Sequence, residues 1–426
     1  MDDLVISMHE NAVNEALKSA YKAFQAKLMG DIKVGGYTLH WEGYQSPEVK
    51  FDIQSVDKAR SYYSRAMELP HHKTADYYPV MKQYVDVAGP TFLVHLYVEI
   101  SAGKNEQGRG DRFLLALKTG IYQDVPRHTK LTVYSIDIEE SYSKDPSSME
   151  LMRKALPGIK NSVNDVLSTF DIPAISLGNK IPLGAPSYQI NNNCLEMHNN
   201  IELDAPLVSS HGQTSSGKDL SIYMSNHLLD CIIKSADIFP LKVNVSGKSS
   251  SKPFFAEYHC KMNLTPAHMA SQEDMIQLGL NVANAKVGAT AGMHMGCAPD
   301  LSAGLAFNLS LQPSLQTWLK ISIRNNSLEF TTHKVNPFTI ICTPTGSPVV
   351  WLLSVIASLI ITPLVSIVSA AVSTLLKGIK ILAFRIPDIK MRIDSSHQII
   401  FSPSTLALKP SGSGILLSGN ISIHVK

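Results

Sequence analysis

Two short segments carry residue types that could support metal or phosphate chemistry. His294 and Cys297, within the segment Met-His-Met-Gly-Cys, offer an imidazole and a thiol, which soft metals prefer as ligands. No second pair of such ligands lies nearby in the sequence, so we expect no metal there. Gly247-Lys-Ser249 resembles the end of a phosphate-binding loop, but that loop requires Gly where this chain has Lys242. The sequence therefore predicts neither a metal site nor a nucleotide cofactor.

The remaining candidates for acid–base or nucleophilic chemistry are equally weak. His71 and His72 lie in a polar stretch and are expected to be solvated. Glu139 and Glu140 are adjacent, so on a strand their carboxylates point to opposite faces and cannot share a substrate. The sequence holds no Gly-x-Ser-x-Gly segment, the turn that presents the nucleophile of many hydrolases. We expect a protein that is not an enzyme and has no cofactor.

Composition favours a globular protein with a large apolar core. Hydrophobic residues make up 44% of the 426 residues and charged residues only 17%, which argues against a disordered chain. The formal net charge is +2, and no basic run interleaved with aromatic residues is present. Nucleic-acid binding is therefore not expected.

Cysteine usage and the N-terminal residues bear on the compartment. An odd number of widely spaced cysteines indicates free thiols in a reducing environment; the five are Cys194, Cys231, Cys260, Cys297 and Cys342. The opening Met-Asp-Asp-Leu-Val is not a positively charged segment followed by an apolar one. We expect a cytoplasmic protein, or one released without a secretory signal peptide.

An internal repeat organises the chain. Residues 3–20 and 219–236 align without a gap and are identical at 7 of 18 positions, where chance gives about one. A second match, Phe170-Asp-Ile-Pro-Ala-Ile175 with Phe384-Arg-Ile-Pro-Asp-Ile389, has an offset of 214 against 216 for the first. Chance likeness between strand-then-helix elements explains one match poorly and two coincident offsets worse. We predict two copies of one module, residues 1–207 and 219–426, joined by a linker at 208–218.

Each copy opens with the same switch of hydrophobic period. Alternate residues are apolar at first, which predicts a short strand: Leu4, Ile6 and Met8, then Leu220, Ile222 and Met224. The period then becomes helical: Val13, Leu17, Ala20, Phe24 and Leu28 in one copy, Leu229, Ile232, Ile233 and Ala236 in the other. We expect Gly30 to cap the first helix. A meander of antiparallel strands, a second helix (147–170 or 349–384) and closing strands complete each copy.

A module repeated twice, each copy opening with this strand-to-helix segment, resembles the tubular lipid-binding superfamily. That superfamily includes the bactericidal/permeability-increasing proteins and the lipid-transfer proteins of plasma. The missing signal peptide and disulfide pair are more similar to its bacterial branch, encoded beside clostridial-type toxin genes. The resemblance implies an elongated α+β fold, with a barrel of twisted antiparallel sheet around a long helix in each half and a central sheet between them. About 18 residues and the two Ile-Pro segments carry it.

The resemblance also implies a ligand, an acyl chain or sterol held between helix and sheet. Each buried methylene contributes about 0.8 kcal/mol, so a long chain could bind without any catalytic group. For any one residue, plain core packing is the competing interpretation. The candidate lipid-binding residues are Val13, Leu17, Tyr21, Phe24, Leu156, Ile159, Val163, Leu167, Leu229, Ile232, Ile233, Trp351, Leu352, Val355 and Leu359.

Residues 349–376 contain no charge, and this length is enough for a transmembrane helix. Pro363 interrupts the run, and Ser or Thr recurs every four residues at Ser354, Ser358, Thr362 and Ser366. Three interpretations remain open: a helix buried in the second barrel or against a partner, a segment that inserts into membranes, and a permanent anchor.

The leading functional hypothesis is non-enzymatic binding or transfer of a lipid, fatty acid or phospholipid. The alternatives are an accessory protein of a bacterial toxin complex, with a protein partner, and an effector that inserts into a membrane through 349–376.

Overall fold

The computed structural model divides the chain into two compact units. The first unit comprises Met1–Ser225, Ile386–Ala407 and Leu416–Lys426, and the second comprises Asn226–Arg385 and Leu408–Ile415. The residues that the structure describes are 2–51, 90–101, 110–125, 128–143, 145–168, 172–173, 181–201, 218–272, 274–345, 354–386, 388–392, 397–411 and 413–426. The units therefore do not follow the sequence halves 1–207 and 219–426, because the last strands of the chain join the first unit. The predicted linker, 208–218, lies outside the described residues except for its last position.

One sheet of the first unit is an antiparallel meander in the order β2-β3-β5-β6-β7-β8, with β4 paired to β5. Its strands are β2 (Met29–Val34), β3 (Tyr37–Gly43), β4 (Glu48–Lys50), β5 (Thr91–Ser101), β6 (Asp111–Val125), β7 (His128–Ser141) and β8 (Ile172–Pro173). Alternate residues such as Phe113, Leu115 and Leu117 on β6 are buried, which is the pattern of a strand with one face on a core.

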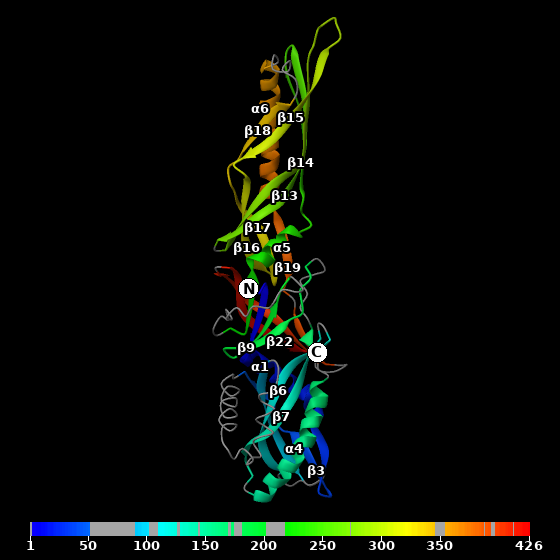
Figure 1. Cartoon of the computed structure of the whole chain (residues 1–426), viewed down its shortest axis with the longest axis vertical. Coiled ribbons are helices and arrows are strands. Elements are labelled where there is room, and N and C mark those ends of the chain that lie inside the picture. The colour runs from blue at the N-terminus through cyan, green and yellow to red at the C-terminus, as the bar shows by residue number, and fades with distance from the viewer. Residues whose placement is uncertain are drawn as a thin grey trace, which may run out of the picture. The chain divides into compact units, whose positions relative to one another are not determined.

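Two helices cover this sheet. Helix α4 (Pro146–Leu167) begins at Asp145, whose carboxylate accepts a hydrogen bond from the Ser147 N–H. Pro157 lies inside this helix without ending it. A Cβ built at Gly158 would lie 3.0 Å from the Ile32 side chain, so glycine lets α4 lie close against β2. Figure 1 shows α4 alongside β7, and the two elements are in contact.

Helix α1 (Glu10–Phe24) ends earlier than its sequence pattern predicts. A 3-10 turn (Gln25–Lys27) follows, and Gly30 lies in β2 rather than capping the helix. The reason is local: Gly30 pairs with Trp41, and a Cβ there would lie 3.0 Å from the indole nitrogen. The expectation of a helical cap at Gly30 was therefore wrong.

The second sheet of the first unit brings together strands from both halves of the sequence, in the order β20-β21-β22-β11-β1-β10-β9. Its strands are β1 (Leu4–His9), β9 (Ser187–Asn191), β10 (Cys194–Asn199), β11 (Leu220–Ser225), β20 (Ile389–Arg392), β21 (Gln398–Ser411) and β22 (Gly414–Val425). At its centre the His9 N–H donates to the Asp219 carbonyl at 3.0 Å, and the Ser225 N–H donates to the Asp3 carbonyl at 2.9 Å. These two bonds are equivalent under the offset of 216 in the repeat.

The second unit has a curled antiparallel sheet in the order β12-β13-β14-β16-β17-β19, with β15 paired to β14 and β18. Its elements are α5 (Asn226–Lys234), β12 (Leu241–Ser251), β13 (Phe254–Gln272), β14 (Met275–Met293), β15 (Leu301–Gln312), β16 (Leu315–Arg324), β17 (Ser327–Val335), β18 (Thr339–Thr345), α6 (Ser354–Lys377) and β19 (Lys380–Arg385). Helix α6 contacts the edge strand β12 as well as β17 and β18, so the sheet curls around the helix (Figure 1).

Helix α6 holds the described part of the uncharged run at 349–376. A row spaced by four residues is fully buried against the sheet: Ile360, Leu364, Val368, Val372 and Leu376. Thr362, Ser366 and Thr374 form an exposed row on the helix. By length and composition Ile360–Lys377 could cross a membrane, a test that the core helix of a soluble protein also passes. The buried row gives α6 a role in the core of the second unit.

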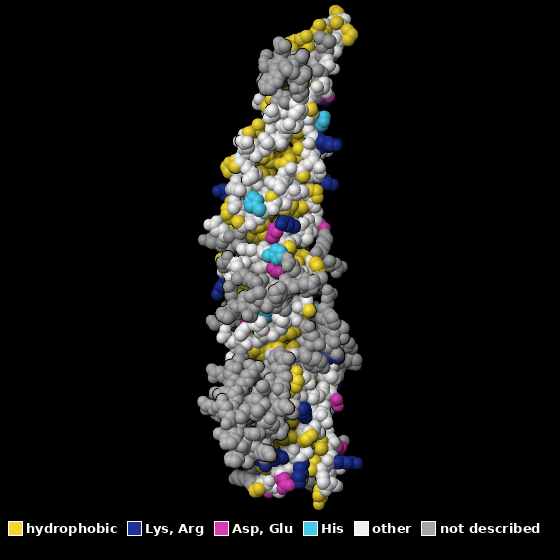
Figure 2. Space-filling view, in the orientation of Figure 1, with side chains coloured by type: hydrophobic (Ala, Val, Ile, Leu, Met, Phe, Trp, Pro, Cys, Tyr) yellow, Lys and Arg dark blue, Asp and Glu magenta, His cyan; other side chains and the backbone are white. Residues whose placement is uncertain are grey.

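Charged side chains do not gather into one large basic area on the visible face. Figure 2 shows the described Lys, Arg, Asp and Glu side chains singly or in small groups there. This distribution agrees with the near-neutral formal charge of +2 and offers no footprint for nucleic acid on that face.

Candidate functional site

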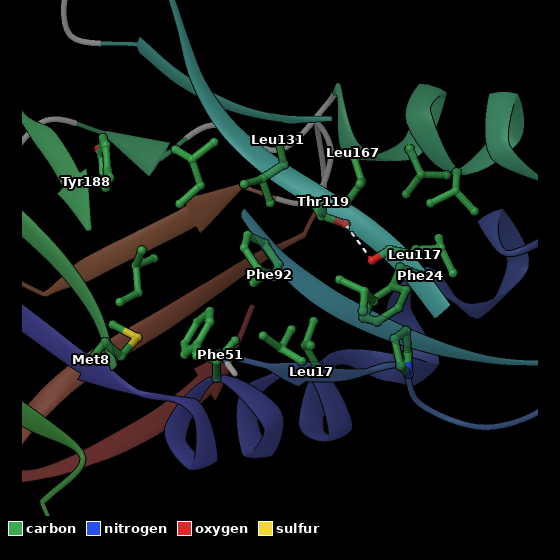
Figure 3. Close-up of a pocket in the computed structure, with 18 of the residues that line it drawn as sticks. Met8, Leu17, Phe24, Phe51, Phe92, Leu117, Thr119, Leu131, Leu167 and Tyr188 are labelled. Carbon is green, nitrogen blue, oxygen red and sulfur yellow. Dashed lines mark hydrogen bonds between the residues drawn. The ribbon is translucent and has the colours of Figure 1, made fainter. Parts of the chain in front are cut away.

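The candidate site is an apolar cavity of about 200 Å³ inside the first unit. Figure 3 shows side chains from α1, from the meander and from the second sheet converging on it. Helix α1 contributes Val13, Leu17 and Phe24, and the end of α4 contributes Val163, Val166 and Leu167. We call this space the first-unit cavity.

Small residues on α1 explain how the helix can approach the protein core and still line a cavity. Ala12, Ala16 and Ala20 form a row spaced by four residues, and all three are buried. Val13 and Leu17 lie one residue further along and therefore occupy the flank of that row. The alanine row packs closely, while the larger flanking side chains face the cavity.

Strands form the opposite wall. Phe92, Val94 and Leu96 alternate along β5 and line the cavity together. Phe92 meets Phe51 edge to face, with ring centroids 5.5 Å apart and an interplanar angle of 80°. Such a pair adds about 0.5–1.5 kcal/mol beyond its buried area. The wall is therefore rigid as well as apolar.

The polar groups at the cavity wall already have partners. The Thr119 hydroxyl donates to the Leu117 carbonyl at 3.5 Å (Figure 3). The Tyr188 hydroxyl shares a hydrogen bond of 2.8 Å with the Thr129 hydroxyl. These hydroxyl groups are thus engaged with the protein rather than presented to a ligand.

Lys390 is the charged residue among those that line the cavity. It pairs with Ile400 across the strands, whereas its neighbour Ile389 pairs with Phe401, and Ile389 and Phe401 both line the cavity. Because side chains alternate along a strand, the Lys390 side chain belongs to the other face of β20. It is exposed, so no charge points into the cavity from this strand.

Some of the predicted lipid-binding residues of the first half meet at this cavity and others do not. Those that line it are Val13, Leu17, Phe24, Val163 and Leu167. Tyr21 instead donates its hydroxyl to the Gly43 carbonyl, and desolvation by burial, followed by the nearby Glu42 charge, raises its pKa. Ile159 is fully buried in the core, and Leu156 packs against that core.

The predicted residues of the second half lie elsewhere. Leu229, Ile232 and Ile233 are on α5 and are buried in the second unit. Trp351 and Leu352 fall outside the described residues, and Val355 and Leu359 lie on α6 with side chains that the structure does not describe. Ligand contact by any of these residues remains a prediction.

Sequence reasoning missed the strand side of the cavity. Lining residues that it did not single out include Met8, Phe51, Phe92, Leu117, Ile121, Leu131, Tyr188 and Phe401. The alternation Phe92-x-Val94-x-Leu96 was a readable signal for one apolar face. It does not reveal which helix, if any, that face meets.

A buried polar cluster in the second sheet of the first unit is the other concentration of titratable groups. The His198 Nδ1 lies 2.7 Å from Asp2 Oδ2, and its Nε2 lies 3.3 Å from Glu196 Oε2, with all three side chains fully buried. Burial lowers the pKa of His198, but the hydrogen bonds to Glu196 and Asp2 outweigh this, so the pKa is raised.

This cluster is suited to holding strands rather than to catalysis. Asn191 also donates to Glu196, at 2.7 Å, so that carboxylate has donors from β9 and β10. His198 has both ring nitrogens engaged and no access to solvent. Among the described residues no group of three or more His, Cys, Asp or Glu side chains could hold a metal ion.

Comparisons with known proteins identify the fold. No family model and no curated protein matches the sequence. The structure of P47 of Clostridium botulinum E1 matches with a TM-score of 0.50 at 10% identity, over 99% of both chains. P47 from Clostridium botulinum A2 matches with a TM-score of 0.43 at 10% identity, over 98% of this chain and 97% of that one. A lipopolysaccharide binding protein matches with a TM-score of 0.31 at 11% identity, over 99% of both.

These identities speak to fold and not to activity. The chain is a mostly-β α+β protein with curled antiparallel sheets and few helices, and the predicted resemblance is confirmed at that level.

Proposed function

We propose that this chain is a non-enzymatic binding protein that holds the hydrocarbon part of a lipid-like molecule in the first-unit cavity. The observation that carries the proposal is the lining, which is apolar and has hydroxyl groups already bonded within the protein. Such a surface can gain free energy by excluding water from an alkyl chain, and it offers nothing to a reacting group.

An empty cavity of this kind is costly to the fold. Cavities in protein cores destabilise by about 24 cal/mol per Å³, so about 200 Å³ left empty costs about 5 kcal/mol. That is a large fraction of the total stability of an ordinary domain. A ligand that fills the space restores the lost contacts, since each buried methylene contributes about 0.8 kcal/mol.

The competing function is an accessory protein that uses this scaffold to bind another protein. It predicts a chain that is stable with the cavity empty and that co-purifies with a partner instead of with lipid. The similarity to P47 supports the scaffold for both functions and does not choose between them.

Mass spectrometry of an organic extract from the purified protein tests the proposal, with a folded protein of similar size as the control. We expect an aliphatic molecule in near-stoichiometric amount from this chain alone. A clean extract, together with failure of the delipidated protein to take up any alkyl compound, would contradict the proposal.

A further inference from the structure

The cavity is small for a whole lipid. An engineered apolar cavity of about 150 Å³ holds benzene, which has six carbons, so about 200 Å³ corresponds to about eight carbons at the same density. A second alkyl chain or a fused-ring sterol exceeds that space. The enclosed part of the ligand is therefore a single short stretch of hydrocarbon.

The lining also decides what must stay outside. A carboxylate, phosphate or hydroxyl placed inside would lose its water and find the hydroxyls of Thr119 and Tyr188 already bonded. Burying a polar group without a hydrogen bond costs several kcal/mol in general, more than a few methylenes supply. Recognition of a head group by this cavity is thus unfavourable.

Burial along the lining gives the ligand a direction. Phe24, Leu96 and Leu117 are almost fully buried, while Leu131 and Tyr188 are half-buried. Figure 3 shows Phe24 and Leu117 together, away from Tyr188. The first group forms the closed end of the cavity, and the second forms its rim.

We propose that the first-unit cavity takes one unbranched alkyl chain, encloses about eight carbons of it with the terminal methyl against Phe24 and Leu117, and leaves the head group outside near Tyr188. This inference rests on the proposed function and narrows it to single-chain amphiphiles, or one tail of a larger lipid, selected by length and not by head group.

A chain-length series tests the inference. Delipidated protein would be titrated by calorimetry with n-alkyl carboxylic acids and the matching alcohols, from six to sixteen carbons and below their micelle concentrations. Affinity should rise about fourfold per methylene up to about eight carbons and then flatten. Acids and alcohols of equal length should bind alike.

Variants at the two ends of the cavity sharpen the test. Leu117→Phe adds bulk at the closed end and should move the break to shorter chains, while Leu131→Ala at the rim should leave the break in place. Thermal unfolding identifies a variant that fails to fold, and the wild-type series stands without it.

The outcomes separate this inference from the proposed function. Affinity that keeps rising to sixteen carbons, or a strong preference for acids over alcohols, overturns the inference while leaving lipid binding intact. Absence of binding at every length, with a clean organic extract, overturns both.

Discussion

Ile6 on β1 and Ile222 on β11 lie directly opposite each other in the register of the sheet, and they are also equivalent residues of the repeat, 216 positions apart. The flanking pairs obey the same exchange: Leu4 with Met224, and Met8 with Leu220. A local two-fold axis therefore passes between these two isoleucines. Two related segments pair with each other here, as equal copies do at an isologous interface.

The symmetric aspartates at this axis should differ in their contribution to stability. Asp3 accepts hydrogen bonds from the Ile201 N–H at 3.0 Å and the Ser225 hydroxyl at 2.6 Å, whereas Asp219 accepts from the Ile421 N–H at 3.1 Å. Because a buried donor left unbonded costs about 1–3 kcal/mol, Asp3→Ala should lose about 3 kcal/mol.

Asp219→Ala should lose about 1 kcal/mol, and Asp165→Ala, on the exposed face of α4, should be neutral. Urea denaturation measures all three variants. Equal losses at Asp165 and Asp3 would contradict the assigned bonds.

The buried cluster around His198 should make stability fall as pH rises. The folded-state pKa of His198 is raised, so its contribution is fully present below the unfolded pKa of about 6.5 and is lost as pH passes through the folded value. Unfolding free energies measured from pH 6 to 9 should decline in the wild type. The decline should be shallower in His198→Gln and unchanged in the exposed control His294→Gln. An identical slope in His198→Gln would remove His198 as the cause.

Thiol reactivity should separate the cysteines by environment. Desolvation by burial, with smaller effects of Glu196 and Glu10, raises the pKa of Cys194 to about 11. Burial, with a smaller effect of Cys342, also raises the pKa of Cys260 to about 11, whereas Cys297 is exposed.

A maleimide reagent at pH 8 should therefore modify Cys297 first and reach Cys194 and Cys260 only on unfolding. Peptide mass spectrometry locates the label, and Cys297→Ser should remove the fast phase. Fast labelling of Cys194 in folded protein would contradict the burial described.

Helix α6 can be tested by placing one charge on each of its faces. Val368 is fully buried and Ser366 is exposed, two positions earlier. Val368→Asp should destabilise the protein by about 4 kcal/mol or more, because it buries an unpaired charge, and Ser366→Asp should be nearly neutral.

Liposome flotation distinguishes the membrane interpretation. A helix that inserts into lipid would lose insertion through Ser366→Asp, even though that variant folds normally. A core helix predicts no flotation of either wild type or variant.

The helix side of the site was readable from sequence because a stripe identifies itself. Val13 and Leu17 were selected on helical period alone, and both line the cavity. The same reasoning selected their equivalents Leu229 and Ile233, which are fully buried in the second unit. Helix α5 has only 9 residues where α1 has 15, so equal patterns lie in different surroundings. A period gives the inward face of an element, but the space beyond that face depends on its partners.

Strand partnership was the part that sequence could not give. The strands β20, β21 and β22 are predicted as closing strands of the second half, yet most of their residues belong to the first unit. Their partner β11 lies far from them in the sequence, and alternation carries no information about such long-range pairing. Phe401 lines the cavity for that reason alone.

The most direct test of the central claim fills the first-unit cavity from α1. Leu17 lines the cavity, and its neighbour Lys18 is exposed on the same helix, so Leu17→Trp and Lys18→Trp form a matched pair. Both would be delipidated and titrated with decanol by calorimetry. The account predicts one bound molecule per chain in the wild type and in Lys18→Trp, and none in a folded Leu17→Trp. Binding in Leu17→Trp equal to the wild type would show that the ligand does not occupy this cavity.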